Sequence, residues 1–180
     1  NEFATEFSTT YNLEPITLDD ASIFSGALSF SQISTATDGA SLSSIPAIPV
    51  ETIAIGTTRF MPSAYGEATL QSGVLVCGFQ NRFPIPITIT VRLEDGTGNT
   101  LVNSSPKQLA VDESAEVVID LTNVSLPNNI SIVTDIASVG TTSPVTIDYS
   151  TQELFIDVAH RDAVLSKIAI VSPITLAFSF

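Results

Sequence analysis

The side chains most able to do chemistry are one histidine and nineteen carboxylates. His160 lies close in the sequence to Asp157 and Asp162, so a Ser-His-Asp arrangement for nucleophilic catalysis is conceivable. The sequence has no nucleophile elbow, no glycine-rich oxyanion loop and no second histidine for a metal site. We therefore interpret His160 as a loop residue between two strands, and we predict no catalytic, cofactor-binding or metal-binding residues.

The carboxylates suggest two further chemistries. Glycoside hydrolysis needs two carboxylates that face each other across a cleft. The chain has no Trp and only three Tyr, so aromatic platforms for sugars are scarce and the acidic residues are better explained as solvated turns. Asp95–Asn99 has oxygen ligands at alternate positions, but it lacks the twelve-residue calcium-loop pattern and predicts a hairpin turn instead. A carbohydrate-active enzyme is the third of our hypotheses, and we predict a protein that is not an enzyme.

The composition excludes several classes of partner. Six basic residues against nineteen acidic ones give a formal net charge of -13, which disfavours binding to nucleic acids and to anionic membranes. No apolar stretch reaches the roughly eighteen residues of a membrane-spanning helix. Cys77, the single cysteine, lies in the apolar run Val74–Phe79 and can form no disulfide within the chain.

Short runs rich in Val, Ile, Thr and Phe, separated by Pro and Gly, predict an all-β domain. The clearest strand is Phe83–Glu94, whose two prolines place its start at a sheet edge or a bulge. One helical turn is expected at 162–167. Roughly eight to ten strands in a chain of this length predict a single-domain β-sandwich or jelly roll. The other expected strands are 52–57, 68–79, 101 onward, 117–121, 130–139, 145–149, 154–158 and 174–180.

Hydrophobic and polar residues alternate at the start of the chain, which indicates a strand with one face for a core. We divide the chain into an N-terminal strand at 1–14 and a sandwich domain at 15–180, with a long Ser/Thr/Pro-rich loop near 31–50. The strand completes either the sheet of its own chain or that of a neighbouring copy. An unpaired sheet edge is a template for a donated strand, and a head-to-tail contact of this kind propagates as a filament. The assembly anchors would be Phe3, Phe7, Tyr11 and Leu13.

Three Asn-X-Ser triplets are potential glycosylation sites at predicted turns or strand ends, and they begin at Asn103, Asn123 and Asn129. Because the sequence does not begin with Met, we expect a processed or trimmed product. Both features favour a secreted, extracellular or cell-surface protein.

The run Ile23–Leu28 resembles the opening motif of the TasA and camelysin group of secreted jelly-roll proteins. The resemblance implies extracellular fibres built by donation of an N-terminal strand. Our first hypothesis is therefore a non-enzymatic structural subunit of an extracellular filament or pilus-like surface assembly. Its partner would be another copy of itself, joined head to tail, or another surface protein. The second hypothesis is a secreted all-β binding module for an apolar or lipid-like ligand.

Overall fold

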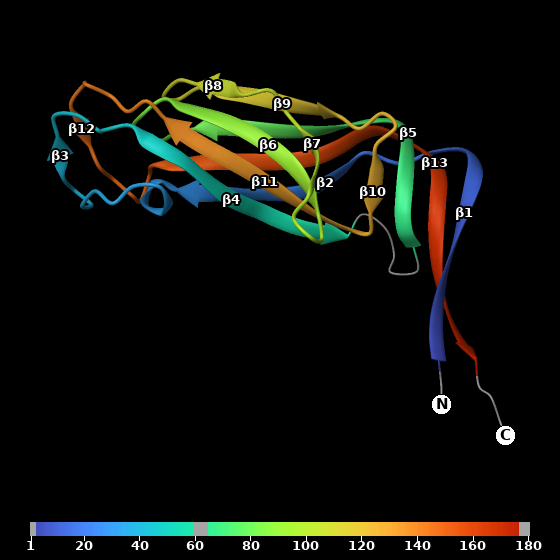
Figure 1. The fold of residues 1–180 in the computed structure, drawn as a ribbon. Helices are drawn as coiled ribbons and strands as arrows, with labels where there is room; N and C mark the ends of the chain where they lie inside the picture. Colours follow the sequence, from blue (N-terminus) through green and yellow to red (C-terminus); the bar gives the residue numbers. More distant parts are fainter. Residues whose placement is uncertain (1–2, 60–64, 177–180) are drawn as a thin grey trace.

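The computed structural model describes residues 3–59 and 65–176, and it describes side chains for residues 10–56 and 66–170. Apart from one short 3-10 turn, η1 (Phe30–Gln32), all regular structure in these residues is β-strand (Figure 1). No helix in this part of the chain has the length and the hydropathy needed to span a membrane. The strands are β1 (Phe3–Thr17), β2 (Ala21–Ser29), β3 (Ser41–Leu42), β4 (Ile48–Arg59), β5 (Tyr65–Asn81), β6 (Ile87–Asp95), β7 (Thr100–Asn103), β8 (Lys107–Leu109), β9 (Ser114–Asp120), β10 (Ser125–Pro127), β11 (Asn129–Ser138), β12 (Val145–Thr146) and β13 (Glu153–Leu176).

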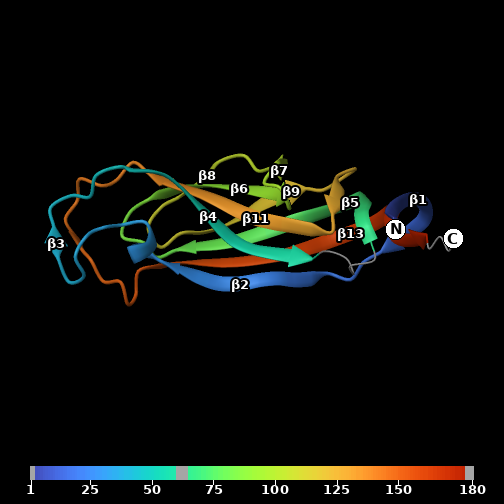
Figure 2. The same cartoon turned by 60° about the horizontal axis from the view of Figure 1, so that its bottom comes forward.

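Two antiparallel sheets pack face to face (Figures 1 and 2). In the first sheet, β13 and β5 are central. On its side away from β5, β13 pairs first with β2 and then, further along, with β1. On its side away from β13, β5 pairs first with β10 and then with β9. The second sheet has the order β4-β11-β6, with β7 and β8 both pairing with β6. Both sheets mix strands from the two halves of the chain, as expected for a jelly roll. The predicted all-β sandwich is confirmed.

The core lies between the two sheets. Strand β6 buries every second residue, and the facing strand β13 does the same from the other sheet, as the period-two rule requires. The rings of Phe30 and Phe83 lie 5.1 Å apart, centroid to centroid, and close one end of the core. The buried residues of β6 and β13 on these two faces include Ile87, Ile89, Val91, Leu93, Leu154, Ile156 and Val158.

Asn81 fixes the segment that leads into β6. Its side chain is fully buried, and Nδ2 donates hydrogen bonds to the carbonyl oxygens of Ile85 (3.0 Å) and Ala110 (2.9 Å). Its Oδ1 accepts from the backbone N–H of Phe83 (3.0 Å). Strand β6 begins only at Ile87, so the prediction that it begins at Phe83 was wrong. The two prolines cannot donate ladder hydrogen bonds, and they lie in this anchored segment ahead of the strand.

The first sheet bends sharply where β5 passes Gly73 and β13 passes Asp162. Gly73 has φ +144° and Asp162 has φ +53°. The register of β13 against β5 shifts at this point, and the N–H of Asp162 donates to Asp20 Oδ1 (2.9 Å). Beyond the bend, β1, β13 and the start of β5 turn away from the sandwich (Figure 1). The helical turn predicted at 162–167 was wrong, because β13 continues through it with a bulge.

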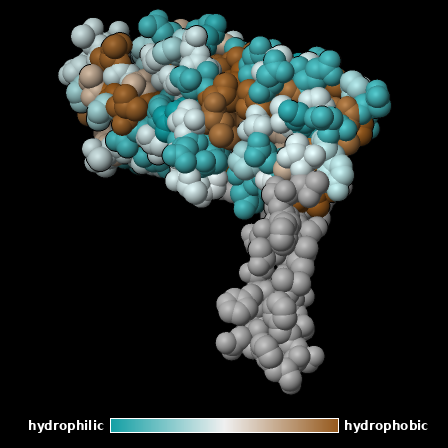
Figure 3. All heavy atoms as spheres, turned by 45° about the vertical axis from the view of Figure 1, so that its right-hand side comes forward, coloured by the Kyte–Doolittle hydropathy of each residue, from teal (hydrophilic) through white to brown (hydrophobic). Residues whose placement is uncertain are grey.

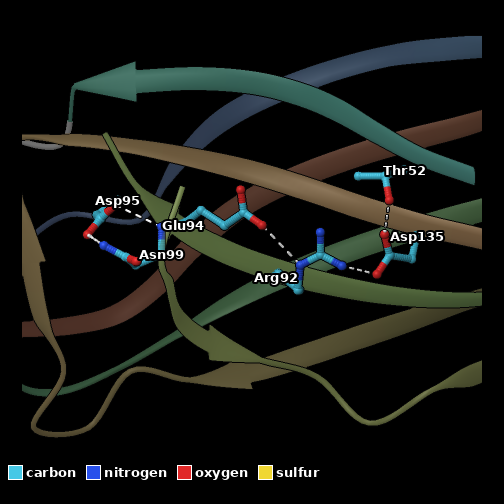
Figure 4. A network of polar contacts seen from close by, with 6 residues as sticks. All are labelled: Thr52, Arg92, Glu94, Asp95, Asn99 and Asp135. Carbon is cyan, nitrogen blue, oxygen red and sulfur yellow. Dashed lines mark hydrogen bonds and ion pairs between the residues drawn. The ribbon is translucent and has the colours of Figure 1, made fainter. Parts of the chain in front are cut away.

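A polar network ties three strands of the second sheet together on its outer surface (Figure 4). Arg92 in β6 forms ion pairs with Glu94 of the same strand (Nε to Oε1, 3.1 Å) and with Asp135 in β11. Thr52 in β4 donates its hydroxyl to the other oxygen of Asp135 (2.7 Å). The contacts of Asp135 with Arg92 and Thr52 cross between strands, and they agree with the register of β11 against β4 and β6.

The long Ser/Thr/Pro-rich segment between β2 and β4 forms the end of the sandwich opposite the bend (Figure 1). It contains η1 and the short strand β3, which pairs with β12. The hydroxyl of Tyr149 donates to the carbonyl oxygen of Ala36 (2.6 Å) and fixes this segment to the chain beyond β12.

Candidate functional site

The structure separates the residues that could have formed a catalytic triad. His160 lies in β13 and not in a loop, so that expectation was wrong. Successive residues of a strand point to opposite faces of the sheet. In β13 the even-numbered residues next to Asp157 are buried, whereas Asp157 is exposed on the outer face. His160 has an even number and so shares the face of the buried residues. Asp157 therefore lies on the face opposite to His160. In the described part of the chain no group of three or more His, Cys, Asp or Glu residues could hold a metal ion.

The Asp95–Asn99 segment forms the predicted hairpin turn between β6 and β7. One oxygen of Asp95 accepts hydrogen bonds from the N–H of Thr97 (2.8 Å) and the N–H of Asn99 (3.0 Å). The other accepts from Nδ2 of Asn99 (3.0 Å). The Thr97 hydroxyl also donates to Asp95, to Oδ1 (2.7 Å). The hydrogen bond from this hydroxyl is the largest cause, ahead of the others, that holds the pKa of the Asp95 carboxyl well below its usual range. The turn supplies its own donors to both carboxylate oxygens.

The first strand pairs with the last strand of the same chain. Over Phe3–Asn12 the register of β1 against β13 is continuous, and Phe3 lies opposite Leu176. In the described residues β13 pairs with β5 only as far as Ile170, so its last part pairs with β1 alone. Strand β1 and the last described part of β13 thus form a two-stranded ribbon beyond the bend (Figure 1). Of the two alternatives that the sequence left open, the strand here completes the sheet of its own chain and not that of a neighbouring copy.

The four expected assembly anchors differ in how far the structure describes and buries their side chains. Phe3 and Phe7 are positions of β1, but their side chains lie outside the described part of the structure. Tyr11 is 51% exposed. Leu13 is partly buried and packs against the core. In the single chain, Leu13 is sheltered and Tyr11 presents half of its surface to solvent.

The three Asn-X-Ser sites are all exposed. Asn103 ends β7, Asn123 lies in a turn with φ +60°, and Asn129 begins β11. Their predicted positions at turns or strand ends are confirmed, and glycosylation itself stays a prediction.

A hollow of about 550 Å³ lies on the outer face of the first sheet, around Gly78 of β5. Gly78 pairs with Asp157 of β13 on one side and with Glu116 of β9 on the other. Both carboxylates are exposed on this outer face. Because neighbouring strands lie about 4.8 Å apart, the two Cα atoms are about 10 Å apart, with no side chain at Gly78 to fill the gap between them.

Phe155 forms the apolar side of this hollow, which we name the Gly78 hollow. Its ring makes a cation–π contact with the guanidinium of Arg82, whose Cζ lies 4.7 Å from the ring centroid. Among the described residues, no ion pair joins Asp157 or Glu116 to a basic side chain. The hollow is therefore open and partly apolar, and its two carboxylates outnumber the one guanidinium that lies over Phe155. On the side of the sandwich that Figure 3 presents, hydrophobic patches lie between hydrophilic side chains.

Cys77 lies next to Gly78 in the chain but faces the core. Its thiol is buried and free, and burial raises its pKa to about 12, with a smaller contribution from the charge of Asp157. A thiol with this pKa stays protonated at neutral pH, so Cys77 acts as a small apolar core residue.

The sequence analysis missed the Gly78 hollow. The signal that could have found it is a glycine inside an apolar strand, Val74–Phe79. Such a glycine weakens a strand and often marks a bulge, a tight bend or a place where a ligand or another backbone comes close.

No family model and no curated protein matches this chain. Among solved structures, the chain is similar to one from the infectious bursal disease virus Gx strain, with 15% identity and a TM-score of 0.32. It is also similar to one from the T13 viral particle of the same virus, with 16% identity and a TM-score of 0.33. Each match covers 94% of this chain but only 40% and 39% of the viral chains. At these TM-scores the likeness assigns neither a family nor a function.

Proposed function

We propose that this chain is a non-enzymatic structural subunit of an extracellular filament or cell-surface assembly that grows by head-to-tail self-association. The observation that supports it best is strand β1. It is fifteen residues long and pairs with β13 along one edge, and in the described residues no strand pairs with its other edge. An open edge of this length is a template for another strand.

The terminal ribbon strengthens this argument. An isolated two-stranded ribbon is marginally stable in water, and further strands are needed to stabilise it. The β1–β13 register puts Phe3, Phe7 and Tyr11 opposite Leu176, Ser172 and Ile168, and residues directly opposite one another share a face. The apolar positions of both strands therefore lie mainly on one face of the ribbon. A neighbouring copy that covers this face, or extends its edge, would supply the missing strands.

The resemblance of Ile23–Leu28 to the TasA and camelysin group favours the same proposal. The structure places this run in β2, the first strand of the sandwich, where Leu28 is buried in the core. Secretion and strand donation, which the resemblance implies, belong to the proposal.

Deletion of residues 1–13 tests the proposal. Electron microscopy and light scattering of the purified full chain should show polymers, and the deletion variant should stay folded but monomeric. Val118→Lys is the matched control, since Val118 is exposed in β9 at the other edge of the sheet. It should polymerise like the parent chain. A full chain that stays monomeric at all concentrations, or a deletion variant that still polymerises, would contradict the proposal.

A second variant separates donation of β1 from addition of a strand to its open edge. Thr5 and Ile174 are opposite one another in the register, so the double variant Thr5→Cys, Ile174→Cys can join β1 to β13 of the same chain by a disulfide. If β1 is donated to a neighbour, the oxidised variant stops polymerising and the reduced variant resumes. If the neighbour adds to the open edge, oxidation leaves polymerisation intact.

A further inference from the structure

We propose that the Gly78 hollow binds a lysine or arginine side chain on an extended segment of a basic partner protein. The site lies on the outer face of the sandwich, and it does not depend on the assembly proposed for the ribbon.

The fold does not need a glycine at position 78. The φ angle of Gly78 is not in the left-handed region, where glycine would be favoured. A Cβ atom built on Gly78 would meet only ordinary contacts, with the nearest at 3.8 Å to the carbonyl oxygen of Asp157. Glycine inside a strand weakens it, and such glycines mark places where a ligand or another backbone comes close. The absent side chain leaves space above Gly78 that an occupant could fill.

The negative charge of two carboxylates favours a cation as the occupant of the hollow. Asp157 and Glu116 flank Gly78 in the two neighbouring strands, so a cation above Gly78 would lie about 5 Å from each strand. At such a distance two carboxylates attract a cation and repel an anion. An ammonium or a guanidinium group fits this arrangement.

The apolar side of the hollow favours a side chain with an aliphatic stem. Lysine and arginine have an aliphatic stem that packs on apolar surface while the charged end stays in contact with water. Phe155 and the open backbone at Gly78 provide that surface. Arg82 of the same chain already lies over the Phe155 ring, so the stem of an incoming residue would pack on the rest of this side chain and on the Gly78 backbone.

The charge of the chain argues for a different protein as the occupant. A second copy has a net charge of -13 and would bring further acidic side chains toward Asp157 and Glu116. A basic partner gains from the same charge, both in the contact and in the rate of encounter.

The test is an NMR titration of the ¹⁵N-labelled full chain with a short Gly/Ser peptide that contains one central lysine. Millimolar peptide at low salt should shift the amide signals of Gly78, Glu116, Asp157 and Phe155, and added salt should weaken the effect. The same peptide with norleucine in place of lysine should leave these signals unchanged. Equal binding of the norleucine peptide, shifts centred elsewhere or no binding would overturn the proposal.

Variants of the chain sharpen the test. Gly78→Val fills the hollow and should weaken binding at least about tenfold. Gly78→Ala, whose Cβ fits the space, serves the same purpose if the valine variant does not fold. Glu116→Gln and Asp157→Asn should each weaken binding. The matched control is Glu67→Gln, because Glu67 is an exposed carboxylate of the same strand outside the hollow, and it should bind like the parent.

Unchanged binding by the Gly78 and carboxylate variants would overturn the proposal. So would signal changes at the hollow that depend on protein concentration without any peptide, because they would show that the occupant is a second copy.

Discussion

A Cβ atom on Gly73 would lie 3.0 Å from the Cα atom of Ala163. Ala163 is fully buried and follows Asp162, the residue at which β13 bends. The two central strands of the first sheet therefore touch backbone to backbone at the bend. Gly73 also has a φ of +144°, which residues with a side chain rarely adopt. The bend depends on both the absent side chain and the backbone conformation.

We expect Gly73→Ala to lower the free energy of unfolding by about 1–3 kcal/mol, because it adds backbone strain and a steric clash at a buried position. Urea denaturation followed by circular dichroism would measure it. Gly78→Ala in the same strand is the matched control, and it should be neutral or stabilising by about 0.5–1 kcal/mol, since its Cβ fits. Equal losses in the two variants would show that the bend at Gly73 has no special requirement.

Asn81→Leu should be strongly destabilising. It removes the partners of the Phe83 N–H and of the Ile85 and Ala110 carbonyls in a fully buried place. A loss of about 3 kcal/mol is expected from buried groups left without hydrogen bonds. The denaturation midpoint would measure it against Asn12→Ala, an exposed control that should change stability by less than about 0.5 kcal/mol. If both variants keep the parent midpoint, the Asn81 hydrogen bonds do not stabilise the fold.

Cys77 should be inert toward thiol reagents in the folded protein. Burial raises its pKa to about 12, and the thiolate is the reactive form. Labelling with a chromogenic disulfide at neutral pH should be slow and should accelerate with added denaturant as the chain unfolds. Val118→Cys, at an exposed position of β9, should label rapidly under the same conditions. Fast labelling of Cys77 without denaturant would mean that this part of β5 opens readily.

Acid should destabilise the fold through its turn aspartates. Hydrogen bonds lower the pKa of Asp95, of Asp148 (chiefly from the Ser150 side chain) and of Asp120 (chiefly from the Thr122 side chain). A carboxyl whose pKa is lower in the folded state stabilises the fold above its unfolded pKa, which is about 4. That stabilisation is lost as the pH falls below this value toward the folded pKa. The melting temperature should therefore drop as the pH is lowered below about 4.

The double variant Asp95→Asn, Asp148→Asn checks the cause. It should melt at a lower temperature than the parent near neutral pH, and the two melting curves should approach one another as the pH falls. Parallel pH profiles for the two proteins would show that these turns do not account for the acid sensitivity.

The sequence predicted the local elements well and the long-range pairing poorly. Period-two patterns located most strands, and Asp95–Asn99 formed the expected turn. The start of β6 was misplaced because Phe83 and Ile85 keep the alternating burial of a strand while the prolines prevent the ladder. The alternation of apolar residues in a sequence indicates which side chains are buried. It does not indicate whether the backbone forms ladder hydrogen bonds.

The same limit explains β13. Residues 162–167 have a helix-capping pattern, but β5 on one side and β1 on the other provide ladder partners, and tertiary pairing outweighs a weak local preference. The pairing of Phe3 with Leu176 joins residues at opposite ends of the chain. A periodic pattern does not specify such a partner. The Gly78 hollow likewise depends on which strands lie beside β5.

Strand β13 runs for 24 residues, from the centre of the sandwich into the terminal ribbon. A tensile force on the ribbon would reach the sandwich part of this strand through the bend at Gly73 and Asp162, so the bend would straighten first. Once the strand is straight, the same force would load its hydrogen bonds with β5 and β2 in shear, all at the same time.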